Sequence, residues 1–138
     1  MHTTLRRAAE EGRIRWVFRD SPLTSIHPLS FEEAESAWCA GEQGKFWEYA
    51  DALYAAQDHI DKARNLDQQL YTVAQGIHAD TVAFKACLDS GRMSETIKTQ
   101  MTEAASLRID GTPTLFINGK RHEGLVSYEK LLAERSQN

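Results

Sequence analysis

The stretch GTPTLFING, residues 111–119, decides the fold more than any other part of this 138-residue chain. A proline opens a β-rich run here, and the run ends at Asn118-Gly119, a pair that favours the type I′ turn of a two-residue β-hairpin. The pattern therefore predicts one strand over residues 114–117 and a returning strand over residues 120–125.

The sequence upstream of this hairpin has the signals of five consecutive helices. Ser30 and Glu33 have the spacing of a capping box, in which each side chain caps a backbone N–H of the first helical turn. Polar capping residues and apolar residues at helical spacing mark the later helices. The predicted helices begin near Ser30, Phe46, Asn65, Asp80 and Ser94, and Ser127 is expected to cap a sixth helix after the hairpin.

The N-terminal part is predicted to form a helix and then a strand. Good helix formers over residues 3–11 precede Gly12, which suits the end of a helix. In residues 14–19, apolar and basic side chains alternate with the period of a half-buried strand. The predicted order is helix, strand, helical block, hairpin and helix, in one domain over residues 1–138.

The composition indicates a globular protein that binds neither nucleic acid nor a membrane. The formal net charge is −4, whereas phosphate recognition normally needs a basic face. We interpret Arg13, Arg15 and Arg19 as one polar face of the predicted strand in preference to a polyanion site. No apolar run reaches membrane-spanning length. The N-terminus lacks the apolar core of a signal peptide, so we expect a cytoplasmic protein as written, and a periplasmic or other extracytoplasmic one if an N-terminal segment is missing.

Three segments together are similar to one known family. They are IRWVFRDSPL with SIHP (residues 14–23 and 25–28), WCAGEQGKFWEY (residues 38–49) and the stretch over residues 111–119. They resemble the DsbA-like branch of the thioredoxin-fold thiol–disulfide oxidoreductases, and the similarity runs across nearly the whole chain.

The resemblance implies an α/β, truncated thioredoxin-like fold of the DsbA type. A helical insertion would lie between an N-terminal helix-strand and a C-terminal hairpin-helix. The resemblance places the insertion at residues 28–108 and the remnant thioredoxin core at residues 1–27 and 109–138.

The resemblance also implies which residues carry function. The family's Cys-x-x-Cys motif performs dithiol–disulfide exchange, and no residue of this chain matches that motif or the strand before it. We therefore expect no catalytic residue here and no such exchange by the chain alone. Thr112 and Pro113 match the family's cis-proline position, which implies a substrate-binding edge for extended peptides. The alternative is a simple strand start with proline at a permitted position.

The two cysteines, Cys39 and Cys87, lie 48 positions apart within predicted helices. The resemblance implies a structural disulfide between them, because some family members carry a second disulfide in the helical block. The alternative is a pair of buried free thiols that act as small hydrophobic groups. Neither cysteine has a His or Cys at zinc-site spacing, so we expect no metal site, and we expect no cofactor.

The family's strand before the Cys-x-x-Cys motif, which nothing in this chain matches, is central in the family's sheet. Without it, the predicted strand over residues 14–19 and the first strand of the hairpin would both have unpaired edges. We expect a homodimer in which a second copy completes the sheet, or else direct pairing between these two strands. For function, the resemblance predicts a DsbA-family oxidoreductase-like protein that is inactive alone. Two alternatives stay open: a non-catalytic peptide-binding or assembly module on a thioredoxin scaffold, and a relative of the glutathione-dependent kappa-type isomerases or transferases.

Overall fold

The computed structural model describes residues 2–62 and 64–135 of the chain. The chain divides into two compact units. The core unit joins the two chain ends, residues 1–19 and 103–138, and the helical unit covers residues 20–102.

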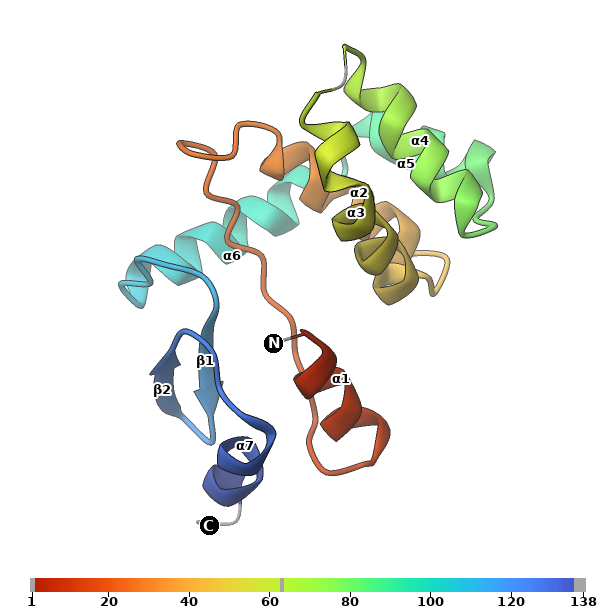
Figure 1. The fold of residues 1–138 in the computed structure, drawn as a ribbon. Helices are drawn as coiled ribbons and strands as arrows, with labels where there is room; N and C mark the ends of the chain where they lie inside the picture. The colour runs from red at the N-terminus through yellow and green to blue at the C-terminus, as the bar shows by residue number, and fades with distance from the viewer. Residues whose placement is uncertain (1, 63, 136–138) are drawn as a thin grey trace. The chain divides into compact units, whose positions relative to one another are not determined.

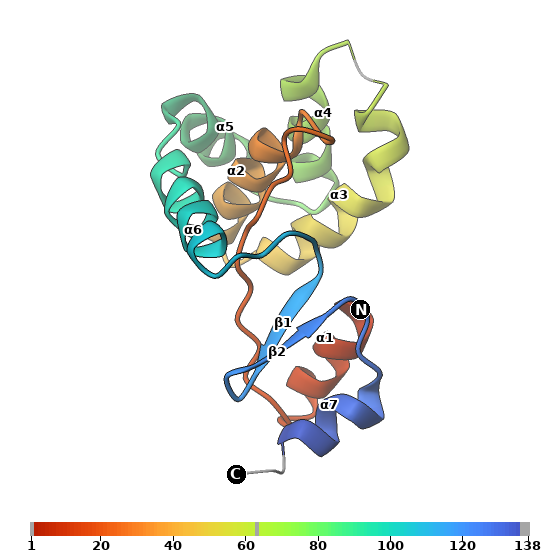
Figure 2. The same ribbon diagram turned by 90° about the vertical axis from the view of Figure 1, so that its left-hand side faces the viewer.

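The core unit is a β-hairpin with two helices packed on one of its faces (Figure 2). Side chains alternate along a strand, so Leu115 and Ile117 point to the same face of the hairpin. That face meets the helices, where Leu5 and Leu131 belong to the buried cluster around Ile117. The elements of this unit are α1 (His2–Glu10), β1 (Thr114–Ile117), β2 (Lys120–Glu123) and α7 (Tyr128–Arg135).

The hairpin itself is confirmed. Strands β1 and β2 pair antiparallel with Ile117 opposite Lys120. The turn between them has φ of 49° at Asn118 and 81° at Gly119, as a type I′ turn requires. The returning strand ends at Glu123, two residues before the predicted end, because the chain adopts a left-handed conformation at Gly124 with φ of 76°.

The predicted strand over residues 14–19 is wrong. The described residues contain no strand before β1, and residues 14–19 run without regular secondary structure. Their burial still alternates, because Ile14 and Trp16 are half-buried against the buried cluster around Ile117, whereas Arg15 and Val17 are exposed. A strand needs a neighbouring strand for its backbone hydrogen bonds, and within the described residues β1 and β2 pair only with each other. The predicted N-terminal helix-strand is therefore a helix followed by an irregular segment.

The helical unit has its own buried hydrophobic cluster. Its helices are drawn in Figure 1. Tyr49, Ile60, Leu70 and Phe84 are completely buried at its centre. The rings of Tyr49 and Phe84 pack with their centroids 5.4 Å apart. The helices are α2 (Ser30–Gly41), α3 (Phe46–Ile60), α4 (Leu66–Gly76), α5 (Thr81–Ser90) and α6 (Ser94–Ser106), of which α6 belongs to this unit as far as Thr102.

Side-chain caps fix two of these helix starts as the sequence predicted. The side-chain oxygen of Asn65 caps α4 by accepting a hydrogen bond from the backbone N–H of Gln68. The Asp80 carboxylate caps α5 by accepting hydrogen bonds from two backbone N–H groups. The predicted capping box at Ser30 is wrong. Helix α2 begins at Ser30 itself, whose hydroxyl donates to the His27 carbonyl oxygen at 2.7 Å, and the N-cap residue Leu29 has no side-chain cap.

Candidate functional site

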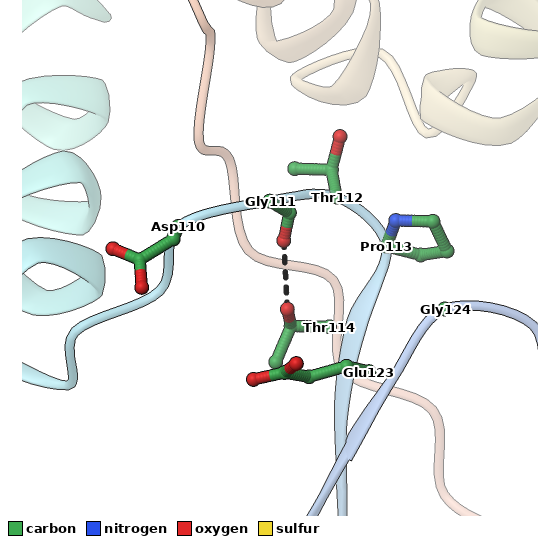
Figure 3. Close-up of a pocket in the computed structure, with 7 residues that line it drawn as sticks. All are labelled: Asp110, Gly111, Thr112, Pro113, Thr114, Glu123 and Gly124. Atoms are coloured by element: carbon green, nitrogen blue, oxygen red, sulfur yellow. Dashed lines mark hydrogen bonds between the residues drawn. The ribbon is translucent and has the colours of Figure 1, made fainter.

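Thr112 and Pro113 lie in the loop that leads from α6 into β1, and the peptide bond between them is cis. The Thr114 hydroxyl donates a hydrogen bond to the Gly111 carbonyl oxygen at 2.7 Å and holds the loop just before the strand (Figure 3). The loop forms one side of a cavity of about 180 Å³. The cavity is lined by Asp110, Gly111, Thr112, Pro113, Thr114, Glu123 and Gly124.

The outer edge of β1 begins at this cavity. In an antiparallel pair, successive residues turn their backbone N–H and C=O groups alternately toward the partner and away from it. The Gly124 N–H donates to the Pro113 carbonyl oxygen at 2.9 Å, so Pro113 faces β2. By alternation, Leu115 also faces β2, whereas Thr114 and Phe116 direct their N–H and C=O groups to the outer edge. Since β1 pairs only with β2 among the described residues, these groups are in place to bond one added extended segment.

Two carboxylates flank the cavity, and the sequence patterns did not predict either. Asp110 is exposed in the loop, and Glu123 stands opposite Thr114 at the end of β2. The Glu123 carboxylate forms an ion pair with the Arg121 guanidinium at 2.8 Å, and the Glu123 side chain is 71% exposed. No lysine or arginine is among the described residues that line the cavity, so its rim is acidic.

The two cysteines belong to the helical unit. Cys39 on α2 and Cys87 on α5 form a disulfide, and each residue is only 1% exposed. They lie in the same core cluster as Tyr49 and Phe84. A thiol reacts as an accessible thiolate, and these sulfurs are bonded to each other and buried. Both sulfur atoms are therefore shielded from solvent as well as bonded to each other.

A buried polar cluster in the helical unit was missed by sequence reasoning. The Asp20 carboxylate accepts a hydrogen bond from the Trp38 indole N–H, and the Asp20 backbone N–H donates to the Gln100 side-chain oxygen at 2.6 Å. Burial raises the pKa of Asp20, and the hydrogen bond from Trp38 partly opposes this rise. The partners lie 18 and 80 positions from Asp20, so no local pattern could have found them.

The described residues provide neither a metal centre nor a membrane-spanning helix. Across residues 2–62 and 64–135, no group of three or more His, Cys, Asp and Glu side chains is arranged to hold a metal ion. In the same part of the chain, every helix is too short or too polar to cross a membrane.

The chain belongs to the thioredoxin family. A family model described as Thioredoxin matches residues 1–133, which is nearly the whole chain. The mixed helices and the small antiparallel hairpin accordingly form a thioredoxin-like fold. No solved structure matches the chain significantly.

The chain is similar to a part of several proteins named Na(+)/H(+) antiporters. It is 38% identical over 120 residues to NhaA 3 of Salinispora tropica and to NhaA 1 of Salinispora arenicola, which covers 87% of this chain and 18% of each relative. It is 34% identical over 109 residues to NhaA 1 of Mycolicibacterium vanbaalenii, which covers 79% of this chain and 17% of that relative. The chain thus spans only 17–18% of the length of these relatives.

Proposed function

We propose that this chain is a non-catalytic relative of the DsbA-type thiol–disulfide oxidoreductases that binds an extended polypeptide segment. The observation that carries the proposal is the outer edge of β1, which has no partner strand among the described residues and begins directly at the Pro113 cavity. Backbone hydrogen bonds to such an edge supply affinity for an extended segment, and adjacent cavities supply selectivity for its side chains.

We assign the family's thiol chemistry to no residue of this chain. The chain has two cysteines, and both form the buried Cys39–Cys87 disulfide. Within these 138 residues, no thiol is therefore free to attack a substrate disulfide. The residues of this chain support the family's binding of extended peptides and provide no group for its thiol exchange.

The test removes one outward N–H from the edge and leaves the hairpin bonds in place. Phe116→Pro deletes the N–H of Phe116, which points away from β2, and proline is tolerated at the solvent side of an edge strand. Phe116→Val changes the same side chain but keeps the N–H. The probe is a fluorescent peptide of alternating threonine and valine, and binding is measured by anisotropy.

We expect the wild-type chain and Phe116→Val to bind the probe and Phe116→Pro to bind it about threefold to tenfold more weakly, because one backbone hydrogen bond to the peptide is lost and such a bond contributes roughly 1 kcal/mol. Circular dichroism melts show whether each variant remains folded. Equal binding by a folded Phe116→Pro variant contradicts the proposal.

A second copy of the chain is the other occupant that we propose for this edge. Pairing of β1 with β1 of a partner copy would complete the sheet as an isologous homodimer. Sedimentation equilibrium tests it: we expect a dimer for the wild type and a monomer for Phe116→Pro. A wild-type monomer at the highest concentration reached contradicts the homodimer.

A second candidate function follows from the relatives. Because proteins named Na(+)/H(+) antiporters contain a segment similar to this chain, we propose that the bound polypeptide is an extended segment of such an antiporter. A peptide array that covers the NhaA 3 sequence of Salinispora tropica tests this. Spots that bind the wild type but not Phe116→Pro support the proposal, and an array without such spots refutes it.

A further inference from the structure

We propose that the β1 edge selects extended segments that carry a lysine or arginine beside the Pro113 cavity and an apolar residue two positions away from it. This inference deepens the peptide-binding function proposed above and rests on it. It assigns a substrate class from the charges and the exposed apolar group along one face of the hairpin.

The basic preference comes from the two carboxylates at the cavity. Figure 3 shows the Asp110 and Glu123 carboxylates on the same side of the segment from Gly111 to Thr114. In the described part of the chain, Asp110 has no ion-pair partner. Glu123 pairs with the half-buried Arg121, but the Glu123 side chain is 71% exposed, so solvent weakens the attraction within this pair. A cation placed between these carboxylates gains attraction from both, whereas an anion is repelled.

Strand register places that cation opposite Thr114. Thr114 and Glu123 are cross-strand partners, so their side chains share one face of the hairpin. A residue of an added strand opposite Thr114 points to the same face, about two strand spacings, or ~10 Å, from Glu123. The long side chains of lysine and arginine can extend toward Glu123 across Thr114, and Asp110 lies in the loop beside this position.

The apolar preference comes from the next position on the same face. Phe116 lies two residues after Thr114 on β1 and is 45% exposed, although phenylalanine favours burial. Its cross-strand partner is Arg121, whose positive charge disfavours a second cation there. A strand residue opposite Phe116 is therefore apolar, and burial of both side chains adds to the affinity.

The experiment compares two peptides that differ at one position. Both alternate threonine and valine, and one carries lysine while the other carries glutamate at a position that has a valine two residues away on each side, on the same face. Anisotropy is measured at low and high salt on the wild type, on the double variant Asp110→Asn/Glu123→Gln, and on Glu129→Gln. The last variant is the matched control, because Glu129 is an exposed carboxylate on α7 that does not line the cavity.

At low salt we expect the wild type and Glu129→Gln to prefer the lysine peptide by about fivefold to tenfold, the sum of two exposed charge pairs. The double variant loses this preference, and salt reduces it in the wild type because exposed charges are screened.

Two further outcomes separate the substrate class from the binding function. Equal binding of both peptides by the wild type, with loss of both in Phe116→Pro, overturns the basic preference but leaves the edge site standing. No binding of either peptide, or no effect of Phe116→Pro, overturns the edge site and with it this inference.

Discussion

Removal of the Cys39–Cys87 disulfide is expected to lower the free energy of unfolding of the helical unit by about 4 kcal/mol. The bond closes a loop of 48 residues and joins α2 to α5. On the chain-entropy account, a cross-link of this span removes enough freedom from the unfolded chain to contribute roughly 4 kcal/mol to stability. The perturbation is the double substitution Cys39→Ala/Cys87→Ala, which keeps both helices and leaves no unpaired thiol.

The packing around the two cysteines indicates whether the measured loss of stability will exceed the loop-entropy estimate. Both cysteines are buried in the cluster that contains Tyr49 and Phe84, so alanine leaves unfilled space where the sulfur atoms stood. This loss adds to the entropic one. We therefore expect the measured value at or above the loop estimate, within the usual range of about 2–5 kcal/mol for lost disulfides.

The assay is a urea titration followed by circular dichroism and by tryptophan fluorescence. Trp38 and Trp47 lie in the helical unit, where their emission reports its unfolding. The control is a reducing agent, which should lower the midpoint of the wild type and leave that of the double variant unchanged. Equal midpoints for the oxidised wild type and the double variant would refute the structural role of the disulfide.

Three more predictions concern Asp20, Gly119 and the thiol chemistry of the chain. Burial raises the pKa of Asp20 in the folded state, so protonation of Asp20 favours folding, and the wild type should become more stable through this group as the pH falls from neutral toward about 4. Asp20→Asn should remove that pH dependence and be more stable than the wild type at pH 7. Asp20→Ala should lower the free energy of unfolding by about 1 kcal/mol, because the Trp38 N–H is left without its partner. Urea midpoints across pH measure both. Gly119→Ala should cost about 1–2 kcal/mol, because φ at this position is 81°, and an unchanged melting temperature would contradict the type I′ turn. Insulin reduction should not exceed the small-thiol background, and turnover that disappears in Cys39→Ala/Cys87→Ala would show that the buried disulfide is reactive.

Local features of the fold could be predicted because each depends on a few neighbouring residues. The Asn118-Gly119 turn needs two residues with positive φ, and the sequence supplies the pair best suited to it. The Asp80 cap likewise needs only the N–H groups two and three residues ahead. Ser30 shows the limit of such patterns, since its hydroxyl bonds backward to the His27 carbonyl oxygen instead of capping α2.

Features that depend on distant partners could not be predicted. The alternation of residues 14–19 is real in burial, but pairing requires a neighbour that the described residues do not supply. At the candidate site, the Thr112–Pro113 position came from family resemblance. The acidic rim was missed because Asp110 and Glu123 meet only when the hairpin brings β2 back beside the loop.

The central claim is that the outer edge of β1 binds an extended segment, and amide hydrogen exchange tests it most directly. Exchange of the Thr114 and Phe116 amides is measured with and without the lysine peptide, with the Leu115 amide as an internal reference because it faces β2. We expect the peptide to slow exchange at Thr114 and Phe116 while Leu115 changes little. Unchanged exchange at both outward amides, under conditions where the peptide is bound, would contradict the account.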